Sequence, residues 1–227
     1  MFESKYSKVL TIILIIVIVA IVILLGFLGY DYYQKYFTTK QASDFVENYQ
    51  SDVTTGDKQE GNNTQEETNA TLDGLDETPT NGGSSSSTGS KKKFKGYTTV
   101  GTMKIPKINL EYPILEKLST QSLATSIVAL YPSGDSVNQP GNTVIIGHNY
   151  RNGLFFSNLK KLSIGDKVYI TDYRGTSITY TIYNKFEASD SDTSFYDRDT
   201  AGKAEITLST CTDASNDQRT IIFAKQD

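Results

Sequence analysis

The chain begins with a long apolar segment. Residues 9–30 contain no charged side chain and are rich in Ile, Val and Leu. At about 1.5 Å per residue, a helix of this length spans a hydrocarbon core of roughly 30 Å. The residues after Gly29 lack the small-residue cleavage site of a secretory signal peptide. The sequence therefore predicts one transmembrane helix over 9–30, retained as an anchor.

The basic residues beside this span indicate its orientation. Lys5 and Lys8 precede it closely, whereas Lys35 and Lys40 follow at a greater distance. Cytoplasmic flanks carry the excess of basic residues. We therefore expect residues 1–8 in the cytoplasm and the rest outside, which describes a single-pass protein of the cell membrane.

A polar stretch follows the anchor. Residues 41–90 are dominated by Ser, Thr, Asn, Gly, Asp and Glu, and they end in a Gly/Ser-rich run before a short cluster of lysines. Such a composition buries too little apolar surface to offset the entropy of ordering. We predict that 31–96 is an extracytoplasmic juxtamembrane segment and disordered tether, with the lysines solvated.

The remaining residues, 97–227, are enough for one domain, and their pattern is mainly β. Short runs rich in β-branched and aromatic residues alternate with Gly, Pro, Asn and Asp. The expected strands are 102–105, 112–115, 142–146, 167–171, 177–186, 203–208 and 220–224. Seven or eight strands in this length predict a closed barrel or a sandwich, with short helices expected within 119–129 and 154–162.

Charge and cysteine content exclude several functions. The net charge of −4 comes mostly from the tether, and no basic face argues for a nucleic-acid partner. The single cysteine excludes an internal disulfide, and no CxxC motif or Cys/His cluster suggests zinc. The sequence therefore gives no indication of a zinc site.

The only His and the only Cys each follow a predicted strand directly. His148 ends the run Thr143-Val-Ile-Ile-Gly-His, and Cys211 ends the run Ile206-Thr-Leu-Ser-Thr-Cys. Strand ends present side chains to a cleft, and a thiolate paired with an imidazole can transfer acyl groups through a thioester. A lone Cys is also commonly a small buried hydrophobe, and a lone His a surface residue.

Arg219 strengthens the catalytic interpretation. It lies eight positions after Cys211 and begins another apolar run, so a tight return between strands brings its guanidinium beside the thiol. A guanidinium is always charged and carries several donors, which suits it to a thiolate, a substrate carbonyl or an oxyanion. Taken alone, Arg219 would be read as a solvated loop residue.

These residues resemble the sortase family. Thr207-Leu-Ser-Thr-Cys211 followed by Arg219 is similar to the family's cysteine signature, and Gly147-His148-Asn149 is similar to its histidine motif. The order His, Cys, Arg also matches, whereas papain-like enzymes place Cys before His. The resemblance implies an eight-stranded β-barrel with Cys211 as nucleophile, His148 as proton-transfer partner and Arg219 as stabilising cation. It further places Thr210 at the substrate groove.

The resemblance also implies a reaction. Sortases cleave an LPxTG-like sorting motif in an exported protein, form a thioacyl-enzyme, and transfer the acyl group to an amine of a cell-wall precursor, without a cofactor. Such chemistry belongs to Gram-positive bacteria. The segment 147–156 and the short Cys-to-Arg spacing favour class B, whereas the brief start of the domain favours class A or D. A pilin-polymerising sortase is an alternative, disfavoured because the tether lacks a lid motif.

The acidic segment 187–199 lies where sortases keep the loop that selects substrate. Phe195 and Tyr196 are predicted to contact an apolar substrate side chain. Its carboxylates are the ligand type that Ca²⁺ prefers, but a solvated polar loop is the favoured interpretation. Two other functions stay open on the sequence: a non-catalytic extracellular β module that binds a partner, and a Cys hydrolase that releases peptides without transfer.

Overall fold

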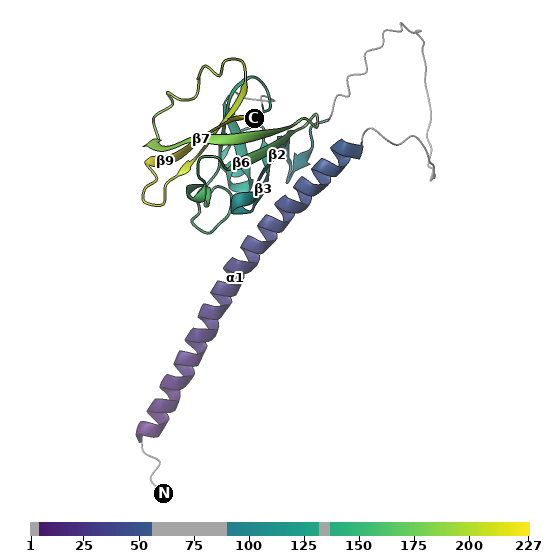
Figure 1. Cartoon of the computed structure of the whole chain (residues 1–227). Helices are drawn as coiled ribbons and strands as arrows, with labels where there is room; N and C mark the ends of the chain where they lie inside the picture. The colour runs from purple at the N-terminus through teal and green to yellow at the C-terminus, as the bar shows by residue number, and fades with distance from the viewer. Residues whose placement is uncertain (1–4, 56–89, 132–136) are drawn as a thin grey trace, which may run out of the picture.

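The computed structural model describes residues 5–55, 90–131 and 137–227. Most of the predicted tether, residues 56–89, lies outside the described residues. Two parts are described: a long N-terminal helix and a β domain that lies beside the second half of this helix (Figure 1).

Eight strands of the β domain form a closed barrel. The neighbouring strands run in the order β2-β3-β4-β5-β8-β9-β7-β6, and β2 also pairs with β6, which closes the ring. The short strand β1 adds to the edge of β2. The strands are β1 Lys93–Phe94, β2 Tyr97–Ile105, β3 Leu110–Leu115, β4 Ile127–Tyr131, β5 Gly141–Ile146, β6 Lys167–Asp172, β7 Ser177–Ser189, β8 Ala204–Cys211 and β9 Gln218–Gln226. The prediction of an eight-stranded, mainly β barrel is confirmed.

Two strand pairs in this barrel are parallel, namely β3 with β4 and β5 with β8. The other pairs are antiparallel. The barrel interior is filled by apolar side chains with no exposed surface, among them Val100, Met103, Ile145, Ile170 and Leu208. These residues come from β2, β5, β6 and β8, so one core joins both parallel and antiparallel parts of the sheet.

Both helices expected inside the domain are shorter than predicted. Within 119–129 only α2, Thr120–Thr125, is helical, and it begins at a capping box between Ser119 and Ser122. The residues after it form β4 instead, because Ile127 and its neighbours make a fully buried apolar run between β3 and β5. Within 154–162 only the 3-10 turn η2, Leu159–Lys161, is regular; a second turn, η1, spans Pro106–Ile108.

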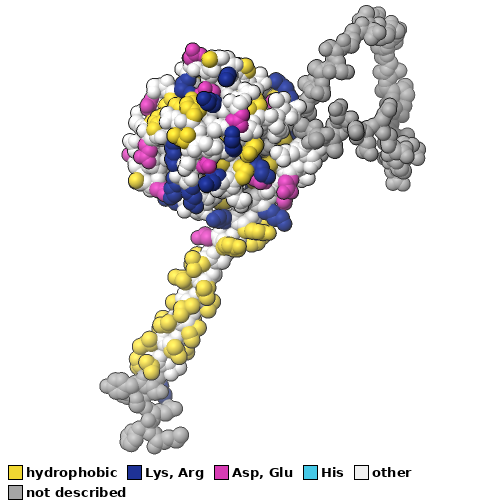
Figure 2. Space-filling view, in the orientation of Figure 1, with side chains coloured by type: hydrophobic (Ala, Val, Ile, Leu, Met, Phe, Trp, Pro, Cys, Tyr) yellow, Lys and Arg dark blue, Asp and Glu magenta, His cyan; other side chains and the backbone are white. Residues whose placement is uncertain are grey.

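The N-terminal helix α1 spans Lys5–Thr55 and is far longer than the predicted anchor. Its segment from Lys8 to Ser51 contains a stretch long and apolar enough to cross a membrane, and none of that stretch is buried in the protein. Figure 2 shows hydrophobic side chains covering the N-terminal half of the helix, whereas the visible face of the barrel mixes acidic, basic and apolar groups.

The last turns of α1 pack against the barrel rather than forming a tether. Ala42, Val46 and Tyr49 are each 1% exposed, and the Phe45 ring lies 5.1 Å from that of Phe94. These positions recur every three or four residues and therefore share one helix face. The chain is thus helical as far as Thr55, where the sequence indicated a flexible tether from residue 41, because the polar composition of 41–90 obscures this apolar stripe.

Gly101 in β2 allows the barrel to close. A Cβ atom at this position would lie 2.5 Å from the backbone oxygen of Thr171 in β6. Neither backbone can move without breaking the β2–β6 ladder, in which Gly101 pairs with Asp172. A side chain is therefore excluded here by the partner strand.

We predict that Gly101→Ala destabilises the barrel by about 1–3 kcal/mol or more, the usual cost of overpacking. Urea unfolding of the full chain in detergent, followed by tyrosine fluorescence, measures the change. Lys107→Ala, at an exposed position just beyond the same strand, is the control. Equal midpoints for the two variants would contradict this account of barrel closure.

Candidate active site

The register of three strands brings the predicted catalytic residues to one edge of the barrel. In the parallel pair β5–β8, Ile146 lies opposite Ser209, so His148 and Cys211 follow at the same end. In the antiparallel pair β8–β9, Cys211 lies directly opposite Arg219. Side chains of opposed residues project to the same face of a sheet. The pairing alone therefore groups the three residues.

The thiol of Cys211 is in contact with a guanidinium. Arg219 Nη1 lies 3.1 Å from Cys211 Sγ and also donates to the backbone oxygen of Asn216. Both side chains are partly exposed, so the thiol is accessible from solvent. A fixed positive charge at this distance stabilises negative charge that develops beside the sulfur during a reaction.

His148 is held at the start of the loop that follows β5. Its backbone oxygen accepts a hydrogen bond of 3.1 Å from the Phe156 nitrogen, and its ring lies 4.8 Å from the ring of Tyr150. Burial lowers the pKa of His148, because removal from water disfavours the charged imidazolium. The imidazole is therefore more readily neutral than an exposed histidine would be.

Gly147 makes room for this loop. A Cβ there would lie 2.9 Å from both the Phe156 ring and the Ile127 side chain. The hydroxyl of Thr210 donates to the Gly147 backbone oxygen at 2.7 Å, and Thr210 itself is 4% exposed. Thr210, predicted to shape the substrate groove, directly precedes Cys211. Its hydrogen bond to Gly147, the residue before His148, therefore ties the two strand ends together.

All six predicted site residues line one pocket of about 260 Å³. Tyr196 lies at its wall with its ring 5.7 Å from that of Tyr131. Phe195 is 7% exposed, and its ring packs 6.1 Å from Phe186 and Phe223, so it belongs mainly to the small core under the loop. The pocket is lined by Leu123, Leu130, Ile146, Gly147, His148, Asp190, Asp192, Phe195, Tyr196, Ser209, Thr210, Cys211 and Arg219. This lining combines apolar side chains with the charged groups Asp190, Asp192 and Arg219.

The acidic residues of 187–199 are spread apart. Asp190 and Asp192 reach the pocket, but in the described part of the chain no group of three or more His, Cys, Asp or Glu side chains could hold a metal ion. Hydrogen bonds from the Ser194 side chain and then from its backbone nitrogen lower the pKa of the Asp192 carboxyl. These carboxylates shape the loop's turns.

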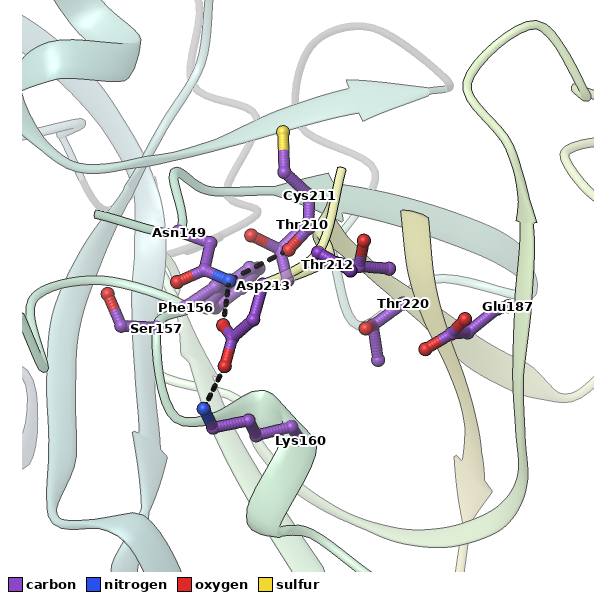
Figure 3. A pocket seen from close by; sticks show the side chains of 11 residues that line it. Asn149, Phe156, Ser157, Lys160, Glu187, Thr210, Cys211, Thr212, Asp213 and Thr220 are labelled. Carbon is purple, nitrogen blue, oxygen red and sulfur yellow. Dashed lines mark hydrogen bonds and ion pairs between the residues drawn. The ribbon is translucent and has the colours of Figure 1, made fainter. Parts of the chain in front are cut away.

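A polar network that the sequence did not reveal lies on the other side of the β8 end. In Figure 3 the sulfur of Cys211 points away from the labelled polar residues, while Asn149 faces Asp213. Asn149 Nδ2 donates to the Cys211 backbone oxygen at 2.9 Å and to Asp213 Oδ1 at 2.8 Å. Asp213 also pairs with Lys160. Hydrogen bonds from Lys160 and then Asn149 lower the pKa of Asp213.

This network joins the loop after His148 to the loop after Cys211. Arg151 adds to it by donating to the backbone oxygens of Thr212 and Asp213, at 3.3 and 3.0 Å. The position of Asn149 directly after His148 was the signal in the sequence. Its partners could not be identified because Asp213 lies 64 positions away.

Comparison with known proteins gives consistent matches. A family model for the sortase domain matches residues 103–227. Sortase A of Bacillus anthracis is 27% identical over 132 residues, covering 55% of this chain and 58% of that protein. The structure of sortase A from Corynebacterium diphtheriae superposes with a TM-score of 0.53 at 30% identity, covering 58% of this chain and 61% of that chain.

A Clostridium perfringens sortase D5 transpeptidase superposes with a TM-score of 0.51 at 28% identity, covering 57% of this chain and 79% of that one. The chain spans somewhat more than half the length of the curated relatives it matches. The matches bear the names sortase A, sortase C and sortase D, so the comparisons do not select one class. Because the family model covers more than half of the sequence, the chain belongs to the sortase family.

Proposed function

We propose that this protein is a membrane-anchored cysteine transpeptidase that cleaves an LPxTG-like sorting motif in exported proteins and joins the acyl product to an amine of a cell-wall precursor. The observation that carries the proposal is the 3.1 Å contact between Arg219 Nη1 and Cys211 Sγ in a pocket that His148 also lines. A nucleophile, a proton-transfer group and a fixed cation are the minimum set for acyl transfer through a thioester.

In the first half-reaction the Cys211 thiolate attacks the carbonyl carbon of the scissile peptide bond. A carbon–sulfur bond forms, and the carbonyl electrons move to the oxygen, whose negative charge the Arg219 guanidinium stabilises. When the tetrahedral intermediate collapses, the carbon–nitrogen bond breaks. The protonated His148 gives its proton to the leaving amine, and a thioester remains on Cys211.

In the second half-reaction an amine attacks the thioester carbonyl. The neutral His148 imidazole accepts a proton from this amine, and the sulfur leaves as thiolate beside Arg219. The burial that lowers the pKa of His148 supports this step, since it favours the neutral base. Water attacking the same thioester would give hydrolysis instead of transfer.

The long apolar helix supports an anchored arrangement, with the barrel outside the membrane. The buried stripe of the helix begins at Ala42, roughly twelve residues after the end of the predicted span. At about 1.5 Å per residue, this separation is about 18 Å along the helix. This arrangement would hold the pocket near the membrane surface, where both exported proteins and wall precursors emerge.

The test of this function uses the full chain in detergent with a panel of LPxTG-like and NPxTG-like fluorogenic peptides and short amine acceptors. We expect cleavage and an amine-linked product from the wild type and neither from Cys211→Ala. Hydrolysis alone at saturating acceptor would contradict transpeptidation. Equal turnover by Cys211→Ala would contradict the cysteine mechanism, and no turnover of any peptide by the wild type would favour the non-catalytic binding module.

The Arg219 side chain is expected to stabilise the transition state through both its hydrogen-bond donors and its positive charge. We predict that Arg219→Ala lowers kcat/KM about 10²–10³-fold, the usual effect of removing one oxyanion donor. Arg219→Lys should recover only part of this loss, because an ammonium lacks the planar fork. Arg174→Lys, in the turn between β6 and β7, is the control. An equal change in kcat/KM for Arg174→Lys and Arg219→Ala would refute the role of Arg219.

His148 offers a direct pH test because it is the only histidine in the chain. In Cys211→Ala, where no thiolate forms, we expect NMR of isotope-labelled histidine to give a pKa below the ordinary value of 6.5. Tyr150→Ala should raise this pKa by exposing the ring to water, which favours the imidazolium. A pKa at or above 6.5 in Cys211→Ala would show that burial does not control this residue.

A further inference from the structure

The loop between β7 and β8 forms one wall of the pocket. It carries Phe195 and Tyr196, whose rings lie 5.2 Å apart. Its two ends bond to other elements, from the Asp190 nitrogen to the Asp217 oxygen and from the Gly141 nitrogen to the Lys203 oxygen. Between these ends its backbone bonds are local turns, such as the one from the Tyr196 nitrogen to the Thr193 oxygen. Local turns of this kind do not fix a loop relative to the barrel, so the position of this wall depends on longer-range contacts.

Arg198 provides one set of these contacts. Its Nη1 lies 2.7 Å from Glu205 Oε2 of β8 and 2.6 Å from the hydroxyl of Tyr183 of β7. Its guanidinium carbon lies 3.9 Å from the ring centroid of Phe223, and its Nε donates to the Phe195 backbone oxygen at 3.2 Å. One side chain thus joins the loop to three strands.

Asn142 of β5 provides a second set. Its Nδ2 donates to the backbone oxygens of Phe195 and Tyr196, at 3.1 and 2.9 Å. Its Oδ1 accepts from Arg198 Nη2 at 2.9 Å and from the Thr207 hydroxyl at 2.8 Å. Asn142 is 5% exposed, so water cannot readily replace these bonds. The two side chains form a single network.

The network is built on a charge pair that is costly to bury. The side chains of Arg198 and Glu205 are only 17% and 13% exposed. A buried pair is weak evidence for added stability, because desolvation offsets much of its attraction. Its better attested use is to select one arrangement. Here Arg198 Nε donates to the loop at Phe195, and Nη2 donates to Asn142, which holds the loop.

We propose that Arg198 and Asn142 are positioning residues that fix the Phe195–Tyr196 wall and so set the affinity for the apolar side chain of the acyl-donor peptide. This inference rests on the proposed transpeptidase function. The Arg198 guanidinium pairs with Glu205 beneath this wall, at 2.7 Å. Neither residue takes part in the bond-making steps.

The test compares two buried asparagines in the full chain in detergent. Asn142→Asp keeps the shape and the acceptor toward Arg198 but removes the donor to both carbonyls. The matched control is Asn138→Asp, because Asn138 also donates to two backbone oxygens, those of Ile170 and Thr176, and accepts from Tyr180. Asn138 does not line the pocket.

We expect Asn142→Asp to raise KM for a cleaved peptide about tenfold, the size expected for the loss of one or two buried hydrogen bonds. The kcat value and the rate at which a small methanethiosulfonate labels Cys211 should stay unchanged. Amide hydrogen exchange should accelerate within 190–200. Asn138→Asp should leave KM and exchange in 190–200 as in the wild type, whatever it does to overall stability.

Equal KM and equal loop exchange in the two variants would overturn the proposal, as would faster exchange with an unchanged KM. If Asn142→Asp does not fold, Arg198→Lys decides by the same readouts, because lysine keeps the charge beside Glu205 but lacks the planar fork. If the wild type cleaves no peptide, the proposed function fails. The exchange comparison then still tests whether the two residues fix the loop.

Discussion

The parallel pairing of β5 with β8 is the constraint on which the site depends. It sends both strands out of the barrel at the same edge, so that residues 63 positions apart emerge side by side. The antiparallel return of β9 then places Arg219 opposite Cys211. Because the β2–β6 ladder closes the barrel, these strand ends cannot separate without breaking the ring of hydrogen bonds. The loops after His148 and Cys211 are further tied together by Asn149 and its partners.

Charge is distributed unequally around the thiol. The Arg219 guanidinium touches the sulfur, whereas the nearby imidazole is partly buried and its pKa is lowered. In the proposed mechanism this fixed cation stabilises negative charge on sulfur and then on oxygen without giving up a proton, and proton transfer falls to His148. Division of these two roles between two residues is consistent with the partly exposed position of both. The loop wall held by Arg198 and Asn142 completes the pocket without entering the chemistry.

The sequence predicted the strands of the barrel and the candidate site residues because both leave local signals. Alternating apolar runs marked the strands, and the unique Cys and His each followed one of them. Prediction from the sequence failed where the structure of a segment depends on residues that are distant along the chain. The apolar run that begins at Ile127 is compatible with a helix or a strand. Its pairing with β3 and β5 makes it a strand. The docked stripe of α1 was hidden by polar neighbours, and Asn142 and Asp213 gave no sign because their partners are remote in sequence.

In the proposed mechanism one cysteine, Cys211, carries the acyl group between donor and acceptor. Intact-mass spectrometry of the full chain, quenched in acid during turnover of a cleaved sorting peptide without added amine, tests it most directly. The account predicts a mass increase equal to the acyl fragment, mapped to Cys211, which disappears when an amine is added. Product formation with no adduct, or an adduct on any other residue, would contradict it.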